Sequence, residues 1–145
     1  MRHAMLLLTT CLGLAPALLP ARDVNGNYAT FGAGSEPCRV YLEARKAGGD
    51  YERAYQEWVG GHLTAYNLLL ENTYNILGDT SAYDLFNELD VLCEDNPDIP
   101  FVQVLGSLVE QLYGERQNLS PGNDSNWDGW LDEIREGAKG KKSSD

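Results

Sequence analysis

Two cysteines far apart in the sequence, Cys38 and Cys93, constrain the fold of this 145-residue chain more than any other feature. The third cysteine, Cys11, lies in the opening MRHAMLLLTTCLGLAPALLPA, which has the basic, apolar and small-residue sections of a secretory signal peptide. We expect residues 1–21 to be removed, by cleavage after Ala21 or alternatively after Ala17. An even pair of cysteines then remains, which predicts one disulfide and an oxidising compartment.

The expected disulfide would contribute strongly to stability. It closes a loop of about 56 residues, which stabilises a fold by about 4 kcal/mol through restriction of the unfolded chain. The chain length allows one domain, and small single domains are only marginally stable. The link would therefore supply a large share of the net stability.

Helical periodicity dominates residues 35–113, the expected helical domain, and no run alternates as a strand would. Cys38, Tyr41 and Leu42 share one face of a first helix. We expect this helix to begin at an N-cap, Ser35, and to stop at Gly48-Gly49.

A longer helix is expected from a cap at Asp50 to Asn72, because aromatic and apolar residues recur there every three or four positions. Gly60 and Gly61 lie in its middle, where each glycine costs about 1 kcal/mol relative to alanine. We expect close approach of another backbone at these glycines, with a kink as the alternative.

Two further helices complete the pattern. Ser81 and Asp84 form a capping box before the third, which ends at Asn96-Pro97 because the residue before proline avoids the helical region. Asp98 is expected to cap the fourth, with Pro100 in its first turn. We predict an all-α fold, a small four-helix bundle clipped by one disulfide.

The flanks differ from this body in composition. Residues 22–34, rich in glycine and asparagine, are interpreted as a flexible N-terminal leader. Residues 114–145 form a polar tail with a short amphipathic helix near residues 126–136, since Trp127, Trp130, Leu131 and Ile134 have helical spacing. The two tryptophans on one face favour docking on the bundle or on a partner.

The same tail offers a competing interpretation. Asp124, Asn126, Asp128 and Gly129 match the start of an EF-hand calcium loop, and Asp132 has an acceptable position. The twelfth position, which needs a bidentate carboxylate, holds Arg135. Because of this mismatch, the main prediction is that the chain binds no metal or cofactor. A calcium-binding module through residues 124–132 is kept as the alternative.

Charge and residue types exclude several function classes. Signal removal leaves 10 basic and 22 acidic residues, a formal charge of 10 − 22 = −12, which argues against nucleic acid and an anionic membrane surface as partners. Free thiols, a His–carboxylate motif and a Gly-rich phosphate loop are missing from the mature sequence, so a non-catalytic protein is predicted. His62, its only histidine, lies on the periodic helix face and is a candidate pH-sensitive or partner-binding residue together with Trp127 and Trp130.

The local patterns CRVYL from Cys38 and CEDNP from Cys93 resemble those of the HdeA/HdeB group of small periplasmic helical proteins. They also resemble the related Tai-type immunity proteins, and WVGGHLTAYN, residues 58–67, is closer to that branch. The resemblance covers about residues 35–113. It implies a helical fold clipped by a Cys38–Cys93 bond, without catalysis.

These observations predict a secreted, most simply periplasmic, protein that binds another protein. In the first hypothesis it is an HdeA-like chaperone that holds an unfolded client in acid. In the second it is an immunity or inhibitor protein that blocks a periplasmic toxin or hydrolase with a preformed surface. Exposed tryptophans would suit such a surface.

Overall fold

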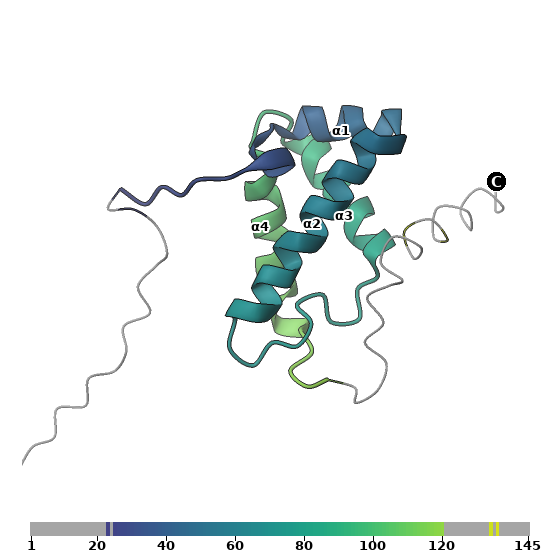
Figure 1. Cartoon of the computed structure of the whole chain (residues 1–145). Helices are drawn as coiled ribbons and strands as arrows, with labels where there is room; N and C mark the ends of the chain where they lie inside the picture. The colour runs from purple at the N-terminus through teal and green to yellow at the C-terminus, as the bar shows by residue number, and fades with distance from the viewer. Residues whose placement is uncertain (1–22, 24, 121–133, 135, 137–145) are drawn as a thin grey trace, which may run out of the picture.

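The computed structural model describes Asp23, residues 25–120, Ile134 and Glu136. Four α-helices form this part of the chain: α1 (Cys38–Ala47), α2 (Gly49–Leu69), α3 (Ala82–Asp95) and α4 (Phe101–Leu112). Short 3-10 helices, η1 (Gly32–Ser35) and η2 (Tyr113–Glu115), precede and follow them. Figure 1 shows α1 lying across one end of the other three helices. The all-α, four-helix prediction is confirmed.

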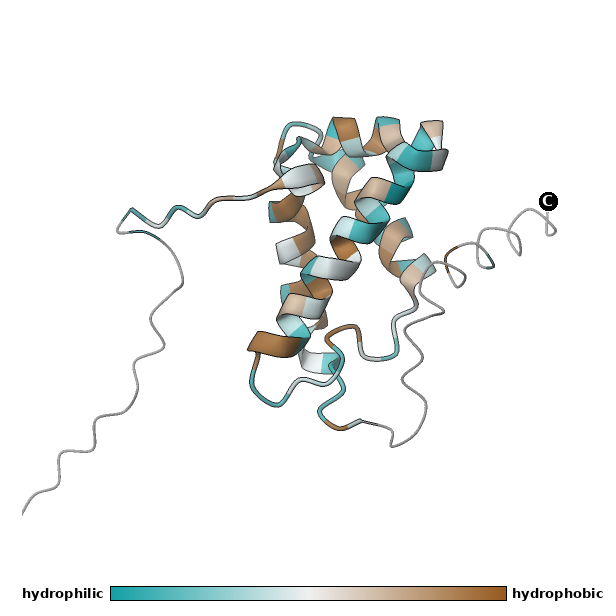
Figure 2. Cartoon of the chain, viewed as in Figure 1, coloured by the Kyte–Doolittle hydropathy of each residue, from teal (hydrophilic) through white to brown (hydrophobic). Residues whose placement is uncertain are grey.

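The predicted apolar faces meet in one core. On α3, the apolar residues at helical spacing, Ala82, Leu85, Phe86, Leu89 and Cys93, are buried, and Leu92 is partly exposed. α4 buries Phe101, Val104, Leu105 and Leu108. Tyr41 of α1 stacks on Phe101 with ring centroids 4.5 Å apart. The outward surface of α2 is largely hydrophilic, apart from its apolar C-terminal turn (Figure 2). Helical periodicity therefore identified the buried faces of α3 and α4. The prediction for α2 was right only in part, because Tyr51 and Leu69 of its periodic face are 76% and 77% exposed while Leu63, outside that face, is buried.

Cys38 and Cys93 form the predicted disulfide, with a sulfur–sulfur distance of 1.97 Å and no exposed surface on either residue. The chain after Cys93 also caps α1 with its backbone. Ile99 O accepts from Cys38 N at 2.9 Å, and Pro97 O accepts from Arg39 N at 2.8 Å. Because these carbonyls satisfy N–H groups of its first turn, α1 starts at Cys38, and the expected N-cap at Ser35 was wrong.

Two other predicted caps were also wrong. Gly48, with φ of 68°, precedes α2, so Asp50 lies in the first turn instead of capping it. Pro100 precedes α4, and Asp98 instead pairs with Arg39 at 2.5 Å. At α3 the prediction is confirmed, because Ser81 Oγ accepts from the backbone N–H of Asp84 at 3.1 Å.

The packed domain is wider than the predicted residues 35–113. η1 packs on α2, where Trp58 Nε1 donates to Phe31 O at 2.8 Å. At the other end, Gln117 N donates to Asn75 O at 2.9 Å and Gln117 O accepts from Tyr74 N at 2.8 Å. None of the helices in the described part is both long and apolar enough to cross a membrane.

Candidate functional site

An aromatic row runs along one face of α2. Trp58, His62 and Tyr66 are spaced by four residues, so they project from the same side of the helix. His62 stacks on Trp58 with centroids 4.8 Å apart and an interplanar angle of 18°. Tyr66 meets His62 edge-on at 5.1 Å. The row places the imidazole between two aromatic rings.

This row borders a groove of about 1390 Å³, which we call the α2/α4 groove. His62, Tyr66 and Leu70 line it from α2 and its C-cap, and Val102 and Val109 line it from α4. Tyr28, in the segment before η1, closes a third side. The groove thus combines an apolar floor with an aromatic wall, which suits an apolar protein segment.

Small residues on α4 help to keep this groove open. Gly106 lines it, and a Cβ added to Gly106 would meet no atom within 4 Å.

On α2, a Cβ at Gly61 would also meet nothing within 4 Å, so the predicted close approach of a backbone at Gly61 was wrong. Close approaches occur at other glycines: an added Cβ would lie 1.9 Å from the side-chain atom Trp58 Cζ2 at Gly34, and 2.2 Å from the backbone oxygen of Glu115 at Gly78.

His62 is half-buried, and this burial lowers its pKa because the charged imidazolium loses solvation. Glu110 of α4 is the only charged side chain among the described residues that line the groove. The hydroxyls of Tyr28, Tyr66 and Tyr113 are the other titratable groups there, and burial raises the pKa of Tyr66. Near neutral pH the imidazole is therefore uncharged.

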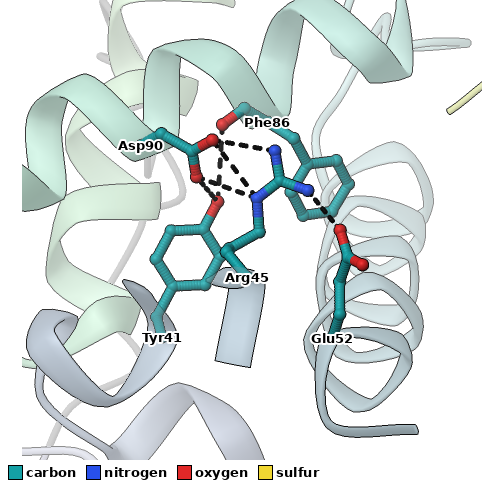
Figure 3. A network of polar contacts seen from close by, with 5 residues as sticks. All are labelled: Tyr41, Arg45, Glu52, Phe86 and Asp90. Atoms are coloured by element: carbon teal, nitrogen blue, oxygen red, sulfur yellow. Dashed lines mark hydrogen bonds and ion pairs between the residues drawn. The ribbon is translucent and has the colours of Figure 1, made fainter. Parts of the chain in front are cut away.

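A polar network joins the N-terminal part of α2 to α1 and α3 (Figure 3). Arg45 of α1 donates from Nε to Asp90 Oδ1 at 2.9 Å and from Nη2 to Asp90 Oδ2 at 2.8 Å, and its Nη1 pairs with Glu52. Burial alone would lower the pKa of Arg45, but its hydrogen bonds to Asp90 raise it on balance. The guanidinium thus stays charged and ties α1 to α2 and α3.

Tyr41 completes the network. Its hydroxyl donates to Asp90 Oδ1 at 2.6 Å, and burial together with the Asp90 charge raises the pKa of Tyr41. Because each polar group of the network is paired with another, we assign it to structure and not to chemistry. Within the described part of the chain, no group of three or more His, Cys, Asp or Glu residues could hold a metal ion.

The predicted site residues fall into two groups. His62 lies in the α2/α4 groove, as described above. Trp127 and Trp130 lie outside the described residues, as does the possible calcium loop at residues 124–132. Ile134 and Glu136, from the predicted short helix, are helical, and Ile134 is 5% exposed within the main core cluster. That part of the tail therefore packs on its own bundle.

Sequence analysis missed the α4 side of the groove. Val102, Gly106 and Val109 are spaced by four and three residues, which is a second helical stripe beside the core-facing one. A helix with two apolar faces has more than one packing surface, and this signal could have indicated the groove.

Comparisons of the chain with models of protein families, with curated proteins and with solved structures find no match.

Proposed function

We propose that this protein is an exported, non-catalytic chaperone of the HdeA-like type, which binds apolar segments of unfolded clients in the α2/α4 groove in acid. The observation that carries the proposal is the uncharged, half-buried His62 stacked in the wall of this groove. Protonation places a charge where solvation is poor, which favours a more open groove.

The packing of the helices supports opening at this groove. α2 packs closely on α1, and α4 packs on α3, whereas the backbones of α2 and α4 approach each other little. The disulfide joins α1 to α3 through Cys38 and Cys93, so it limits unfolding without holding the groove shut. Separation of α2 from α4 would thus expose apolar surface while the chain stays linked.

The net charge acts in the same direction. After signal removal the side-chain charge changes from −12 near neutrality to about +11 in strong acid, when the carboxylates are neutral and the 10 basic residues and His62 are charged. Positive self-repulsion then favours expansion. Compact, expanded acid states of this kind expose apolar surface.

The test is a light-scattering assay with the disulfide-intact mature protein. Alcohol dehydrogenase, used as the client, is brought to about pH 2, where acid states are commonly populated. We expect suppression of client aggregation in acid and none at neutral pH, and His62→Phe should shift the onset of suppression to lower pH. Failure of the wild-type protein to suppress aggregation in acid would contradict the proposal.

A second candidate is an immunity or inhibitor protein that blocks a periplasmic toxin or hydrolase. The exposed apolar end of α2 favours it, since Leu68 and Leu69 are 81% and 77% exposed and exposed leucines suit a preformed interface. The test is inhibition of a toxin or hydrolase encoded beside this chain. Leu68→Asp should abolish that inhibition, and undiminished inhibition by this variant would argue against the α2 surface.

A further inference from the structure

The positive and negative charges of the chain are strongly segregated. Residues 54–115, which include most of α2 and all of α3 and α4, contain 11 acidic residues and not one lysine or arginine. Within the described residues, the ion pairs of this segment involve only Asp90 and Asp98, whose partners Arg45 and Arg39 belong to α1. The remaining carboxylates create a negative potential that attracts cationic partners.

A second, smaller groove lies in this acidic segment, between α3 and α4. It has a volume of about 300 Å³. Leu85 and Leu108, which are 1% and 4% exposed, form its apolar floor. Asp84 and Glu88 stand on its α3 rim, and Gln111 stands on its α4 rim. We call it the α3/α4 groove.

The rim carries two like charges four residues apart on one helix, an arrangement that destabilises a helix by repulsion. The Asp84 carboxylate accepts a hydrogen bond from Ser81 Oγ at 2.7 Å. The Glu88 carboxylate is exposed and forms no ion pair within the described residues. A cation placed between the two carboxylates would relieve their repulsion.

The floor and the rim together select the chemistry of an occupant. Lysine and arginine lay an aliphatic stem along apolar surface while the charged head remains at its edge. Here the stem would cover Leu85 and Leu108, and the head would reach Asp84 and Glu88. We propose that the α3/α4 groove is a docking site for a lysine- or arginine-rich segment of a second protein.

This site is separate from the proposed chaperone groove. It uses α3 and the opposite edge of α4, and none of its lining residues lines the α2/α4 groove. Binding at the α3/α4 groove depends on charge and therefore weakens as salt screens the carboxylates. Either proposal can fail without affecting the other.

Binding can be measured by fluorescence anisotropy with a labelled peptide in which lysine alternates with leucine, added to the full mature chain at neutral pH. A peptide with glutamate in place of lysine is the control probe. We expect the lysine peptide to bind, with an affinity that falls as salt rises, and the glutamate peptide not to bind. Glu88→Gln and Gln111→Lys should each weaken binding about twofold to fivefold, as expected for exposed charge pairs.

Glu57→Gln is the matched control, because it removes the same charge from an exposed position on α2 outside the groove. If Glu88→Gln weakens binding no more than Glu57→Gln does, attraction is diffuse and the docking site is refuted. A chain that ends at Ala138 lacks the basic residues Lys139, Lys141 and Lys142. If this shortened chain binds the lysine peptide with unchanged affinity, a segment of a second protein remains the proposed occupant. Severalfold tighter binding would show that the chain's own end occupies the groove, and would overturn the proposal.

Discussion

Gly34 lies directly against the indole ring of Trp58, so that a Cβ at this glycine would stand only 1.9 Å from Cζ2. Three residues earlier in the chain, Phe31 O accepts the hydrogen bond from Trp58 Nε1. The two contacts fix the indole on which His62 stacks. The segment before α1 therefore positions the aromatic wall of the α2/α4 groove.

Gly34→Ala should destabilise the protein by about 1–3 kcal/mol, because overpacking forces the indole or the backbone to move. Gly61→Ala is the control, since it adds the same methyl group within α2 where no atom lies within 4 Å. That control should raise the free energy of unfolding by up to about 1 kcal/mol through helix propensity. Urea unfolding measures both, and equal effects of the two substitutions would contradict the assigned packing.

Arg45→Met should lower the free energy of unfolding by about 2–3 kcal/mol, because it leaves the partly buried Asp90 and Glu52 without their cation. The matched control is Arg39→Met, whose pair with Asp98 is exposed and should contribute less than about 1 kcal/mol. Chemical unfolding of both variants provides the comparison. If Arg45→Met lowers the free energy of unfolding as little as Arg39→Met does, the structural role assigned to the network is contradicted.

The sequence predicted those features that repeat locally. Four helices, the buried faces of α3 and α4, and the third helix's start at Ser81 follow from periodicity and capping. The disulfide follows from cysteine number once a signal peptide is assumed. The predicted N-caps at Ser35, Asp50 and Asp98 were wrong, because Pro37, Gly48 and Pro100 precede those helices instead. The α1 start depends on the carbonyls of Pro97 and Ile99, about 60 residues away in the chain.

The candidate site was predictable only in part. His62 was recognised because it lies on a periodic face, but its partners across the groove come from α4. The position of Gly34 was missed because a glycine in a Gly-rich segment has the composition of a flexible leader, whatever packs against it. Long-range pairing of side chains, as between Arg45 and Asp90, has no local signature either.

Replacement of both Cys38 and Cys93 by alanine should destabilise the protein by about 4 kcal/mol, since the unfolded chain loses the restriction of a 55-residue separation. Unfolding of the wild-type protein with reductant should match that of the double variant. Alkylation of the denatured chain that starts at Arg22, which contains only these two cysteines, should detect no free thiol before reduction. A reactive thiol at either position would exclude the bond.

Tyr55→Phe should leave stability unchanged or raise it by about 1 kcal/mol. The Tyr55 hydroxyl is buried and has no hydrogen-bond partner among the described residues, so its removal relieves a desolvation cost. Its ring packs edge-on against Tyr41 and Phe101, at 5.2 Å from each centroid, and phenylalanine keeps these contacts. Tyr41→Phe is the contrasting variant, since it removes a hydroxyl that donates to Asp90 and should destabilise the protein.

The stability of the folded state should depend on pH through His62. Because burial lowers the folded-state pKa of His62, the unfolded chain binds more protons than the folded chain below the ordinary histidine pKa of about 6.5. The stability linked to His62 is therefore fully present above that pH, and it is lost progressively as the pH falls toward the folded-state pKa. His62→Phe should keep the stacking on Trp58 and remove this part of the pH dependence.

Two measurements check the role of His62. Urea unfolding across the pH range should give a smaller slope of stability against pH for His62→Phe than for the wild type. NMR titration of the imidazole carbons, unambiguous in a chain that starts at Arg22 and so has one histidine, should give a folded-state pKa below that of the urea-unfolded chain. A folded-state pKa equal to or above the unfolded value would reverse the sign of the linkage. It would also remove His62 as the group through which, in the proposed function, acid opens the groove.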